Sequence, residues 1–149
     1  MAATLASIIV KLQDRNLVLP EHAMADIEPL TGLIVELHSE KWILGHKHWR
    51  NMRIPVVSFE NLAGGSLKKH SEYAQIAILN RSLPDQELAF WGLLVQGVPE
   101  TMKLTDADVV LVDEPLGEAD LMAVEVKGQR ACIPDLGMIE TRLSEHLAV

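Results

Sequence analysis

Short runs of alternating apolar and polar residues, separated by turn-forming residues, constrain the fold of this chain most. Successive side chains of a β-strand point to opposite faces, so a period of two is typical of a strand with one buried face. Gly, Pro, Asn and Asp interrupt the runs at short intervals, as they do between strands. The pattern therefore predicts a mainly β protein, either a barrel or a sandwich.

The predicted strands are spread along the whole chain. Residues 14–16 are predicted to form the turn of a first hairpin. Pro20 can open a helix at its first turn, so a short helix is predicted over 21–27, and Pro29 ends it. The remaining predicted strands, by residue number, are 8–12, 17–19, 33–37, 52–59, 73–80, 88–95, 109–112, 121–126 and 131–133.

Two residues inside these strands indicate local irregularity. Pro55 has no backbone N–H to donate, so its strand is predicted to lie at a sheet edge or to contain a bulge. Gly92 indicates a bulge or a close approach of two backbones. The last predicted element is a helix that Asp135 caps, with Glu140 off its apolar stripe. That stripe consists of Leu136, Ile139, Leu143 and Leu147.

Length and charge limit the possible functions. The 149 residues fit a single domain over 1–149, or two small subdomains that share a core. The formal net charge is −8, with 13 Lys and Arg against 21 Asp and Glu, whereas a nucleic-acid-binding domain normally has a basic face. Aromatic residues make up only 4%, too few for a base-stacking surface. Nucleic acid is therefore excluded as the expected partner.

The sequence also predicts a cytoplasmic protein that does not insert into a membrane. The first residues have no basic start, and no apolar run approaches the roughly 18 residues that a membrane span needs. The single cysteine, Cys132, suits a reducing compartment. Because Cys132 lies in an apolar run, we expect it to pack as a small hydrophobic residue rather than react.

One feature could indicate an enzyme. His46 and His48 are two residues apart, so in a strand both rings would face the same side and could bind one metal ion, with His38 nearby in the sequence. No further ligands at a known spacing accompany them, and no nucleophile elbow or phosphate-binding loop is present. We therefore predict no catalytic, metal or cofactor site, and keep a small metal-dependent enzyme as an alternative.

Residues 45–57 carry the most specific motif. Their pattern, G-x-x-x-x-R-N-x-x-I-P-V-V, resembles the signature G-x-x-x-x-R-G-x-x-I/V-P-V-I of CheW-like domains. Weaker likenesses to the same family occur at 17–27, 92–100 and 127–135. The chain departs from the family pattern at Asn51, where Gly is usual, and at Gln96, where Asp is usual. Asn tolerates a positive φ better than other non-glycine residues, so the tight corner can be kept.

The resemblance implies a fold and a function. CheW-like domains consist of two small SH3-like β-barrels that share a hydrophobic core, with short helices and a C-terminal helix. They are adaptors without an active site or cofactor. They bind the regulatory domain of a CheA-type histidine kinase and the cytoplasmic tip of a methyl-accepting chemoreceptor. The chain would then couple receptor and kinase, whereas an interaction module with an unrelated partner is the remaining alternative.

The resemblance also implies a set of partner-binding residues. These are Met24, Asp26, Gly45, Arg50 and Asn51. Asp26 and Arg50 are expected to form an exposed ion pair that orients Arg50, and such a pair stabilises a fold by at most about 1 kcal/mol. Trp42 and Trp49 flank Gly45 and are either core or interface residues. The Trp-rich form of the motif is similar to the ChpC-type members of pilus-associated chemosensory systems, which serve twitching motility.

Overall fold

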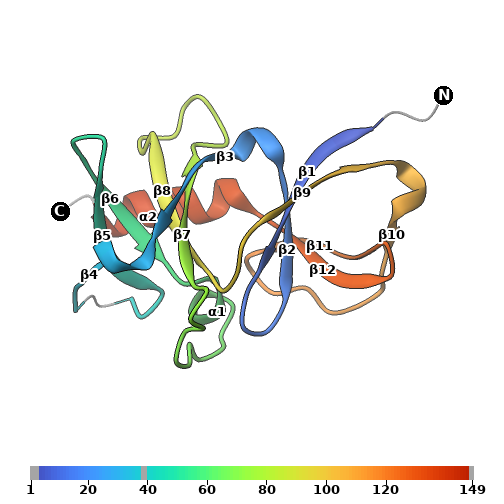
Figure 1. Ribbon diagram of the computed structural model, residues 1–149, viewed down its shortest axis with the longest axis horizontal. Coiled ribbons are helices and arrows are strands. Elements are labelled where there is room, and N and C mark those ends of the chain that lie inside the picture. Colours follow the sequence, from blue (N-terminus) through green and yellow to red (C-terminus); the bar gives the residue numbers. More distant parts are fainter. Residues whose placement is uncertain (1–3, 38–39, 148–149) are drawn as a thin grey trace.

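The structure, a computed structural model, describes residues 4–37 and 40–147 and contains two six-stranded sheets (Figure 1). The first sheet has the order β10-β11-β12-β2-β1-β9 and the second the order β3-β7-β8-β6-β5-β4. The first sheet consists of β1 (Leu5–Lys11), β2 (Asn16–Pro20), β9 (Glu100–Leu104), β10 (Val109–Leu111), β11 (Asp120–Val126) and β12 (Gln129–Pro134). The second consists of β3 (Met24–Pro29), β4 (Ile34–Val35), β5 (Ile43–Trp49), β6 (Met52–Val57), β7 (Gln75–Asn80) and β8 (Phe90–Val95).

Helices are few and short. The 3-10 turns are η1 (Glu21–Ala23), η2 (Leu30–Gly32) and η3 (Asp106–Asp108). The α-helices are α1 (Phe59–Leu62) and α2 (Leu136–Leu147). Asp135 caps α2 as predicted, because its carboxylate accepts a hydrogen bond from Met138 N at 3.1 Å. None of the helices in the described ranges is long and apolar enough to cross a membrane.

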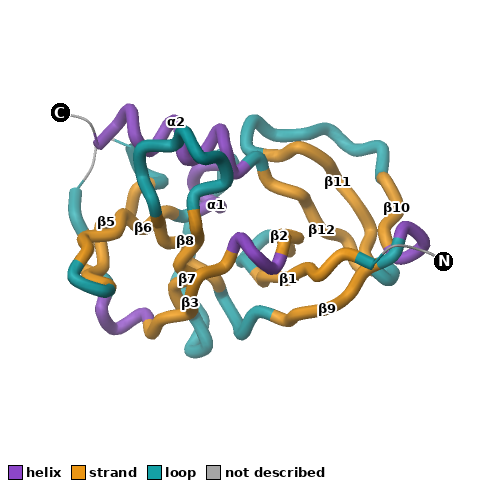
Figure 2. Tube along the Cα trace, turned by 90° about the horizontal axis from the view of Figure 1, so that it is seen from above, coloured by secondary structure: helices purple, strands orange, loops and turns teal. Residues whose placement is uncertain are grey.

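The chain crosses between the two sheets twice. It begins in the first sheet with the hairpin β1–β2, builds all of the second sheet, and returns for β9 to β12. The parallel pairing of β12 with β2, at Cys132 and Leu17, locks the early hairpin between late strands. Seen along another axis, the strands of the first sheet form a ring (Figure 2). The two sheets are therefore interleaved in sequence.

Three apolar clusters hold the fold together. One lies within the second sheet around Trp49 and Ile76, and another within the first sheet around Leu104 and Val124. The third and largest joins residues of both sheets with Ile139 and Leu143 of α2. Each sheet thus encloses a small core, and a shared core unites them, which confirms the predicted mainly β fold with a C-terminal helix.

Several local predictions were wrong. Only residues 21–23 are helical, because from Met24 onward the backbone pairs with β7 and makes its hydrogen bonds there. The strand predicted at 33–37 is reduced to the two residues of β4. Pro55, predicted to mark an edge or a bulge, lies in an interior strand rather than at an edge, and the bulge of the β5–β6 pair is in β5, between Ile43 and Gly45. Pro55 is tolerated because the parallel ladder with β8 begins only at Val56.

Other local predictions were confirmed or missed. Gly92 does mark a close approach, since a Cβ there would lie 2.9 Å from Ile76 Cγ2. The strand β9 was missed because its first two residues are polar and its alternation is limited to Met102, Lys103 and Leu104, of which only Leu104 is buried. The helix α1 was missed as well, although Ser58 caps it through a hydrogen bond from Asn61 N.

Candidate partner-binding site

The motif at 45–57 forms a hairpin with an exposed two-residue turn. Trp49 pairs with Met52, so Arg50 and Asn51 alone connect β5 to β6. Their φ angles are 49° and 62°. A tight turn of this kind requires a positive φ at both central residues, which Asn adopts readily and Arg rarely does. The fold therefore holds both side chains at the exposed end of the hairpin.

Trp49, the residue before this turn, supports the turn through its buried side chain. It is only 4% exposed and packs in the core of the second sheet. Its Nε1 donates a hydrogen bond to Asp26 Oδ2 at 2.9 Å, and its ring meets that of Phe90 edge-on at 4.9 Å. The Arg50 guanidinium lies 4.4 Å from the centre of the Trp49 ring, within the range of a cation–π interaction. Trp49 therefore connects Asp26 to Arg50.

The predicted ion pair between Asp26 and Arg50 is not formed. Within the described residues, no charged nitrogen of Arg50 lies within 4.0 Å of an Asp26 oxygen. Asp26 instead accepts hydrogen bonds from Trp49 and from the backbone N–H of Ile27, the latter at 2.8 Å. These two bonds lower the pKa of the Asp26 carboxyl, and the charge of Arg50 lowers it further. Arg50 thus acts on Asp26 at longer range.

Two other predicted site residues lie in the interior. Gly45 is buried, and a Cβ there would lie 1.9 Å from the carbonyl oxygen of Ile34. Its φ of +154° and the register shift between Ile43 and Gly45 place it at a bulge beside β4. Met24 is partly buried and packs against the shared core. The structure therefore brings Asp26 and Arg50 together through Trp49, while Gly45 and Met24 shape the strands around them.

One of the two histidines of β5, His46, meets a carboxylate that also binds an arginine. His46 Nδ1 lies 2.5 Å from Glu36 Oε1, and Arg53 Nη2 contacts both oxygens of Glu36 at 3.0 and 2.9 Å. These contacts lower the pKa of the Glu36 carboxyl. The rings of His46 and His48 are 5.3 Å apart and edge-on. Across 4–37 and 40–147, no group of three or more His, Cys, Asp or Glu residues could hold a metal ion; His38 lies outside the described residues.

The remaining candidates from the sequence are packing residues. Trp42, like Trp49, is 4% exposed, and it belongs to the shared core. Cys132 is partly buried and packs against the same core. Burial raises the pKa of the Cys132 thiol, so less of the reactive thiolate is present at neutral pH.

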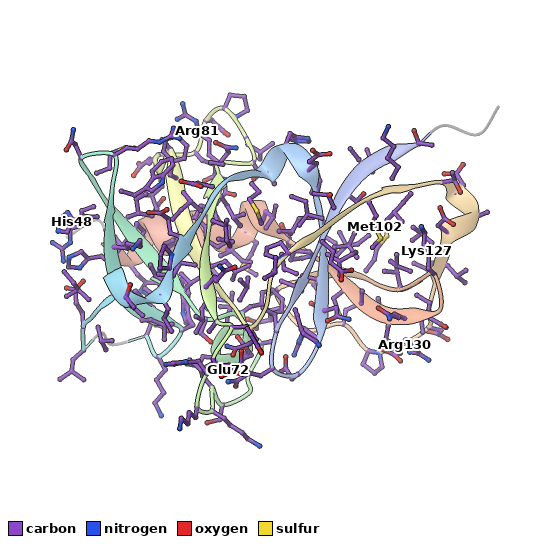
Figure 3. All side chains as sticks on the ribbon, viewed as in Figure 1. His48, Glu72, Arg81, Met102, Lys127 and Arg130 are labelled. Carbon is purple, nitrogen blue, oxygen red and sulfur yellow. The ribbon has the colours of Figure 1, made fainter. Side chains whose placement is uncertain are left out.

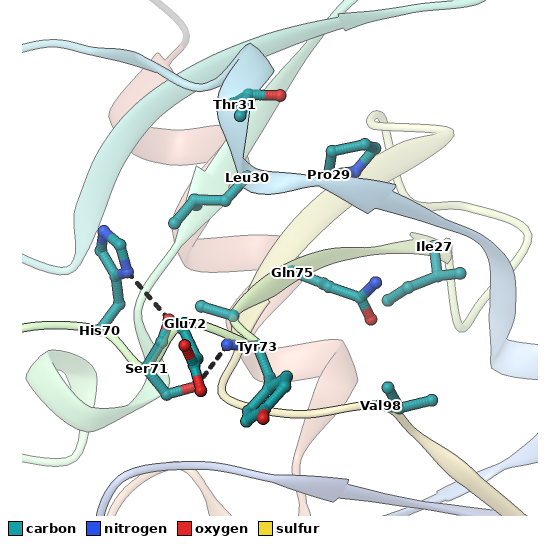
Figure 4. Close-up of a pocket in the computed structure, with 11 residues that line it drawn as sticks. Ile27, Pro29, Leu30, Thr31, His70, Ser71, Glu72, Tyr73, Gln75 and Val98 are labelled. Carbon is teal, nitrogen blue, oxygen red and sulfur yellow. Dashed lines mark hydrogen bonds between the residues drawn. The ribbon is translucent and has the colours of Figure 1, made fainter.

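A pocket of about 760 Å³ lies next to β3 and was not predicted (Figure 4). Its walls come from the end of β3, from η2 and from the segment that precedes β7. Tyr73 and Val98 are the exposed apolar side chains at its mouth. The lining residues are Ile27, Pro29, Leu30, Thr31, His70, Ser71, Glu72, Tyr73, Ala74, Gln75 and Val98. No local pattern in the sequence indicates this pocket, because it forms between segments that are distant in the chain.

Comparison with known proteins identifies the family. The sequence model of the CheW-like domain matches residues 7–142, which is most of the chain. The chain belongs to the CheW-like domain family. Members of this family are non-enzymatic scaffolds in chemotaxis signalling, so the family assignment confirms the prediction that the chain is not an enzyme.

Solved structures support the fold of this CheW-like domain. The crystal structure of the scaffolding protein CheW from Thermoanaerobacter tengcongensis superposes with a TM-score of 0.75 at 14% sequence identity. The match covers 93% of this chain and 89% of that chain. A search of the curated proteins gave no match.

Proposed function

We propose that this CheW-like domain couples chemoreceptors to a CheA-type histidine kinase by binding both. The observation that carries the proposal is the family match over residues 7–142 on a fold with two interleaved sheets. Coupling then means that the receptor state changes the free energy of the contacts that the domain makes with the kinase. In this proposal residues 1–149 act as one unit in the cytoplasm, where they are recruited to membrane-bound receptor arrays.

The proposed partner-binding surface is centred on Arg50 and Asn51. Both residues are exposed in a turn whose backbone conformation is costly for Arg, and such strain is often kept for function. Asp26 fixes the Trp49 ring under Arg50 through a hydrogen bond. Gly45 and Met24 act indirectly, because they set the position of β5 and β3.

We further propose that the receptors and kinase belong to a pilus-associated chemosensory system. The support is the Trp-rich form of the motif. Trp49 directly precedes Arg50, and Lys47 lies between His46 and His48. These residues resemble the ChpC-type members of the family. Deletion of the gene would then impair twitching motility and leave swimming unchanged, and the opposite result would assign the domain to a swimming system.

Isothermal titration calorimetry tests the main proposal. The full chain is titrated with a CheA-type regulatory domain, with and without a receptor cytoplasmic fragment, from the same organism. We expect a dissociation constant in the micromolar range or lower, and weaker binding by Arg50→Ala at a nearly unchanged melting temperature. Lys103→Ala, which removes an exposed cation from β9 in the other sheet, is the matched control. If the chain binds neither the kinase domain nor the receptor fragment, the coupling function is refuted.

A further inference from the structure

A cluster of exposed basic residues lies beside α1, in a chain whose formal net charge is −8. Its members come from three segments, which are the end of β1, the residue before Trp42 and the loop between α1 and β7. This cluster, the basic surface, consists of Lys11, Lys41, Lys68, Lys69 and His70. A local excess of positive charge on an acidic protein favours a partner surface of opposite charge.

Asn61 of α1 connects two of the three segments. Its Nδ2 donates a hydrogen bond to the carbonyl oxygen of Lys41 at 2.9 Å, and its Oδ1 accepts one from Leu67 N at 2.7 Å. Lys68 follows Leu67 directly, so the backbones of Lys41 and Lys68 are held close together. Figure 3 shows Glu72, which belongs to the same loop, at the lower edge of the molecule.

Gln96 connects this loop to β1. Its backbone N–H donates to the carbonyl oxygen of Lys11 at 2.7 Å, and its Oε1 accepts a hydrogen bond from Ser71 N at 2.8 Å. The Ser71 hydroxyl also donates to the carbonyl oxygen of Gln96 at 2.8 Å. Gln96 is only 7% exposed. His70, the residue before Ser71, is therefore held near the strand that carries Lys11 by hydrogen bonds to a buried residue.

Gln13, in the turn between β1 and β2, fixes the two lysines of the loop. Its Nε2 donates to the carbonyl oxygens of Lys68 and Lys69 at 2.9 and 3.2 Å, and its Oε1 accepts from Lys68 N at 2.8 Å. The backbone N–H of Gln13 donates to Oε2 of the buried Glu60 at 3.0 Å. The backbone of both lysines is thus tied to the core, while their side chains are exposed. Charges held at fixed positions bind a complementary partner with a smaller loss of conformational entropy.

The charges of the basic surface are available to a partner. Within residues 4–37 and 40–147, no carboxylate oxygen lies within 4.0 Å of the ammonium group of any lysine of this surface. Two acidic residues are close to it in the sequence. Asp14 is paired with Arg15 at 2.9 Å, and Glu72 lines the pocket beside β3 (Figure 4). Ion pairs within the described part of the chain therefore leave the lysines of the basic surface uncompensated.

We propose that the basic surface binds an acidic segment, rich in Asp and Glu, of a partner protein. This inference goes beyond the coupling function and concerns a surface separate from the turn at Arg50 and Asn51. The strand β6 begins at Met52, directly after that turn, and ends at Val57, just before α1. A strand of this length spans about 20 Å, so the two surfaces lie at opposite ends of β6.

The fixed positions of the lysines favour a protein segment over a nucleic acid or a membrane. Binding to nucleic acids and anionic membranes depends mainly on the number of available cations. Both are also large enough to extend beyond the basic surface, where the net charge of −8 repels them. An acidic peptide segment contacts the basic surface alone.

Fluorescence anisotropy with a labelled oligoglutamate peptide tests the proposal on the full chain. We expect binding that weakens as the ionic strength rises, and no binding of an oligoglutamine peptide of the same length. The double variant Lys68→Gln, Lys69→Gln should bind oligoglutamate about fivefold more weakly or worse. The matched control is Lys103→Gln, Lys127→Gln, which removes two exposed lysines of the first sheet and should bind as the original chain does.

Three results would overturn the inference. The first is a lack of oligoglutamate binding by the original chain. The second is an equal loss of affinity in the two double variants, because the peptide would then respond to net charge alone. The third is binding of phosphatidylserine vesicles or single-stranded DNA that is tighter than binding of oligoglutamate and is lost in Lys68→Gln, Lys69→Gln. In that case a membrane or a nucleic acid is the anionic partner.

Gln13→Ala tests whether the position of the lysines matters as well as their charge. The variant keeps every lysine and the backbone N–H that binds Glu60, but it loses the three side-chain hydrogen bonds to the loop. We expect affinity for oligoglutamate to fall about twofold to threefold and the Lys68 amide to exchange faster with solvent. Faster exchange with unchanged affinity would overturn the role of Gln13. Because neither receptor nor kinase is used, these results do not depend on the coupling function.

Discussion

Trp91 of β8 donates a hydrogen bond from Nε1 to Glu140 Oε2 of α2 at 3.2 Å. Both residues are fully buried, and the other carboxylate oxygen of Glu140 accepts bonds from Ser82 N at 2.8 Å and Ser82 Oγ at 3.1 Å. Glu140 therefore fixes the C-terminal helix to a central strand and to the loop that precedes it. The apolar stripe of α2 and this single carboxylate together hold the helix in place.

Glu140→Ala should lower the free energy of unfolding by about 2–4 kcal/mol, because it leaves the buried N–H of Trp91 without an acceptor and removes the two bonds from Ser82. Urea denaturation followed by circular dichroism measures the change. Glu145→Ala, an exposed carboxylate on the same helix, is the matched control and should change stability by less than about 0.5 kcal/mol. Equal effects of the two substitutions would contradict a structural role for the Glu140 hydrogen bonds.

The stability contributed by Glu140 should depend on pH. Burial raises the pKa of its carboxyl above the ordinary 4.5, although the bonds from Ser82 and Trp91 oppose the shift. Above the raised pKa the folded protein must hold a buried charge, and below it the folded state binds a proton more readily than the unfolded state. The original chain should therefore gain stability relative to Glu140→Gln as the pH falls from neutral towards 4.5. A constant difference would show that the buried carboxyl titrates normally.

Gly45→Ala should be strongly destabilising. A Cβ at this position would lie 1.9 Å from Ile34 O, and the φ of +154° disfavours any L side chain. We expect a loss of about 2 kcal/mol or more, with faster amide hydrogen exchange in β4 and β5. Gly97→Ala is the control, because the nearest atoms to its Cβ belong to Lys11 at 3.9 Å. A Gly45→Ala variant as stable as Gly97→Ala would contradict the close approach of β4 and β5.

Local patterns in the sequence were sufficient for most strands and turns. The alternation in β1, β2, β7 and β11 indicated strands, and a tight turn at Lys127 and Gly128 joins β11 to β12. Both turn residues have a positive φ, 48° and 84°. The segment 21–27 was misjudged because the spacing of Ala23, Met24 and Ile27 also fits a helix. Pairing with β7 decides its conformation, and that pairing is not visible locally.

The contacts that matter most at the site could not be predicted from the sequence. Trp49 and Asp26 are 23 residues apart, and β5 and β3 are separated by three strands in the sheet order. Their hydrogen bond exists only because the sheet curls, a property of the whole sheet. Likewise Glu140 is off the apolar stripe of α2, and it is buried because the loop around Ser82 covers that side of the helix.

We expect the purified protein to contain well under one equivalent of zinc and its melting temperature to be insensitive to a chelator. His46 Nδ1 and both oxygens of Glu36 are engaged with each other and with Arg53, so they are not arranged as ligands. Elemental analysis measures the metal content. His46→Ala should lower stability slightly and leave the metal content unchanged. One bound zinc per chain, lost in His46→Ala, would support the metal-site alternative.

Asp26→Asn should remove a contribution to stability that depends on pH in the opposite sense to that of Glu140. The bonds from Trp49 and Ile27 hold the pKa of the Asp26 carboxyl below the ordinary 3.8. Its contribution is therefore fully present well above pH 3.8 and is lost as the pH falls through the lowered folded-state pKa. Urea denaturation should show a constant difference between the original chain and Asp26→Asn from pH 7 to about 5, and a shrinking difference below. In a Trp49→Phe background this pH dependence should weaken, and its persistence there would assign the low pKa to another donor.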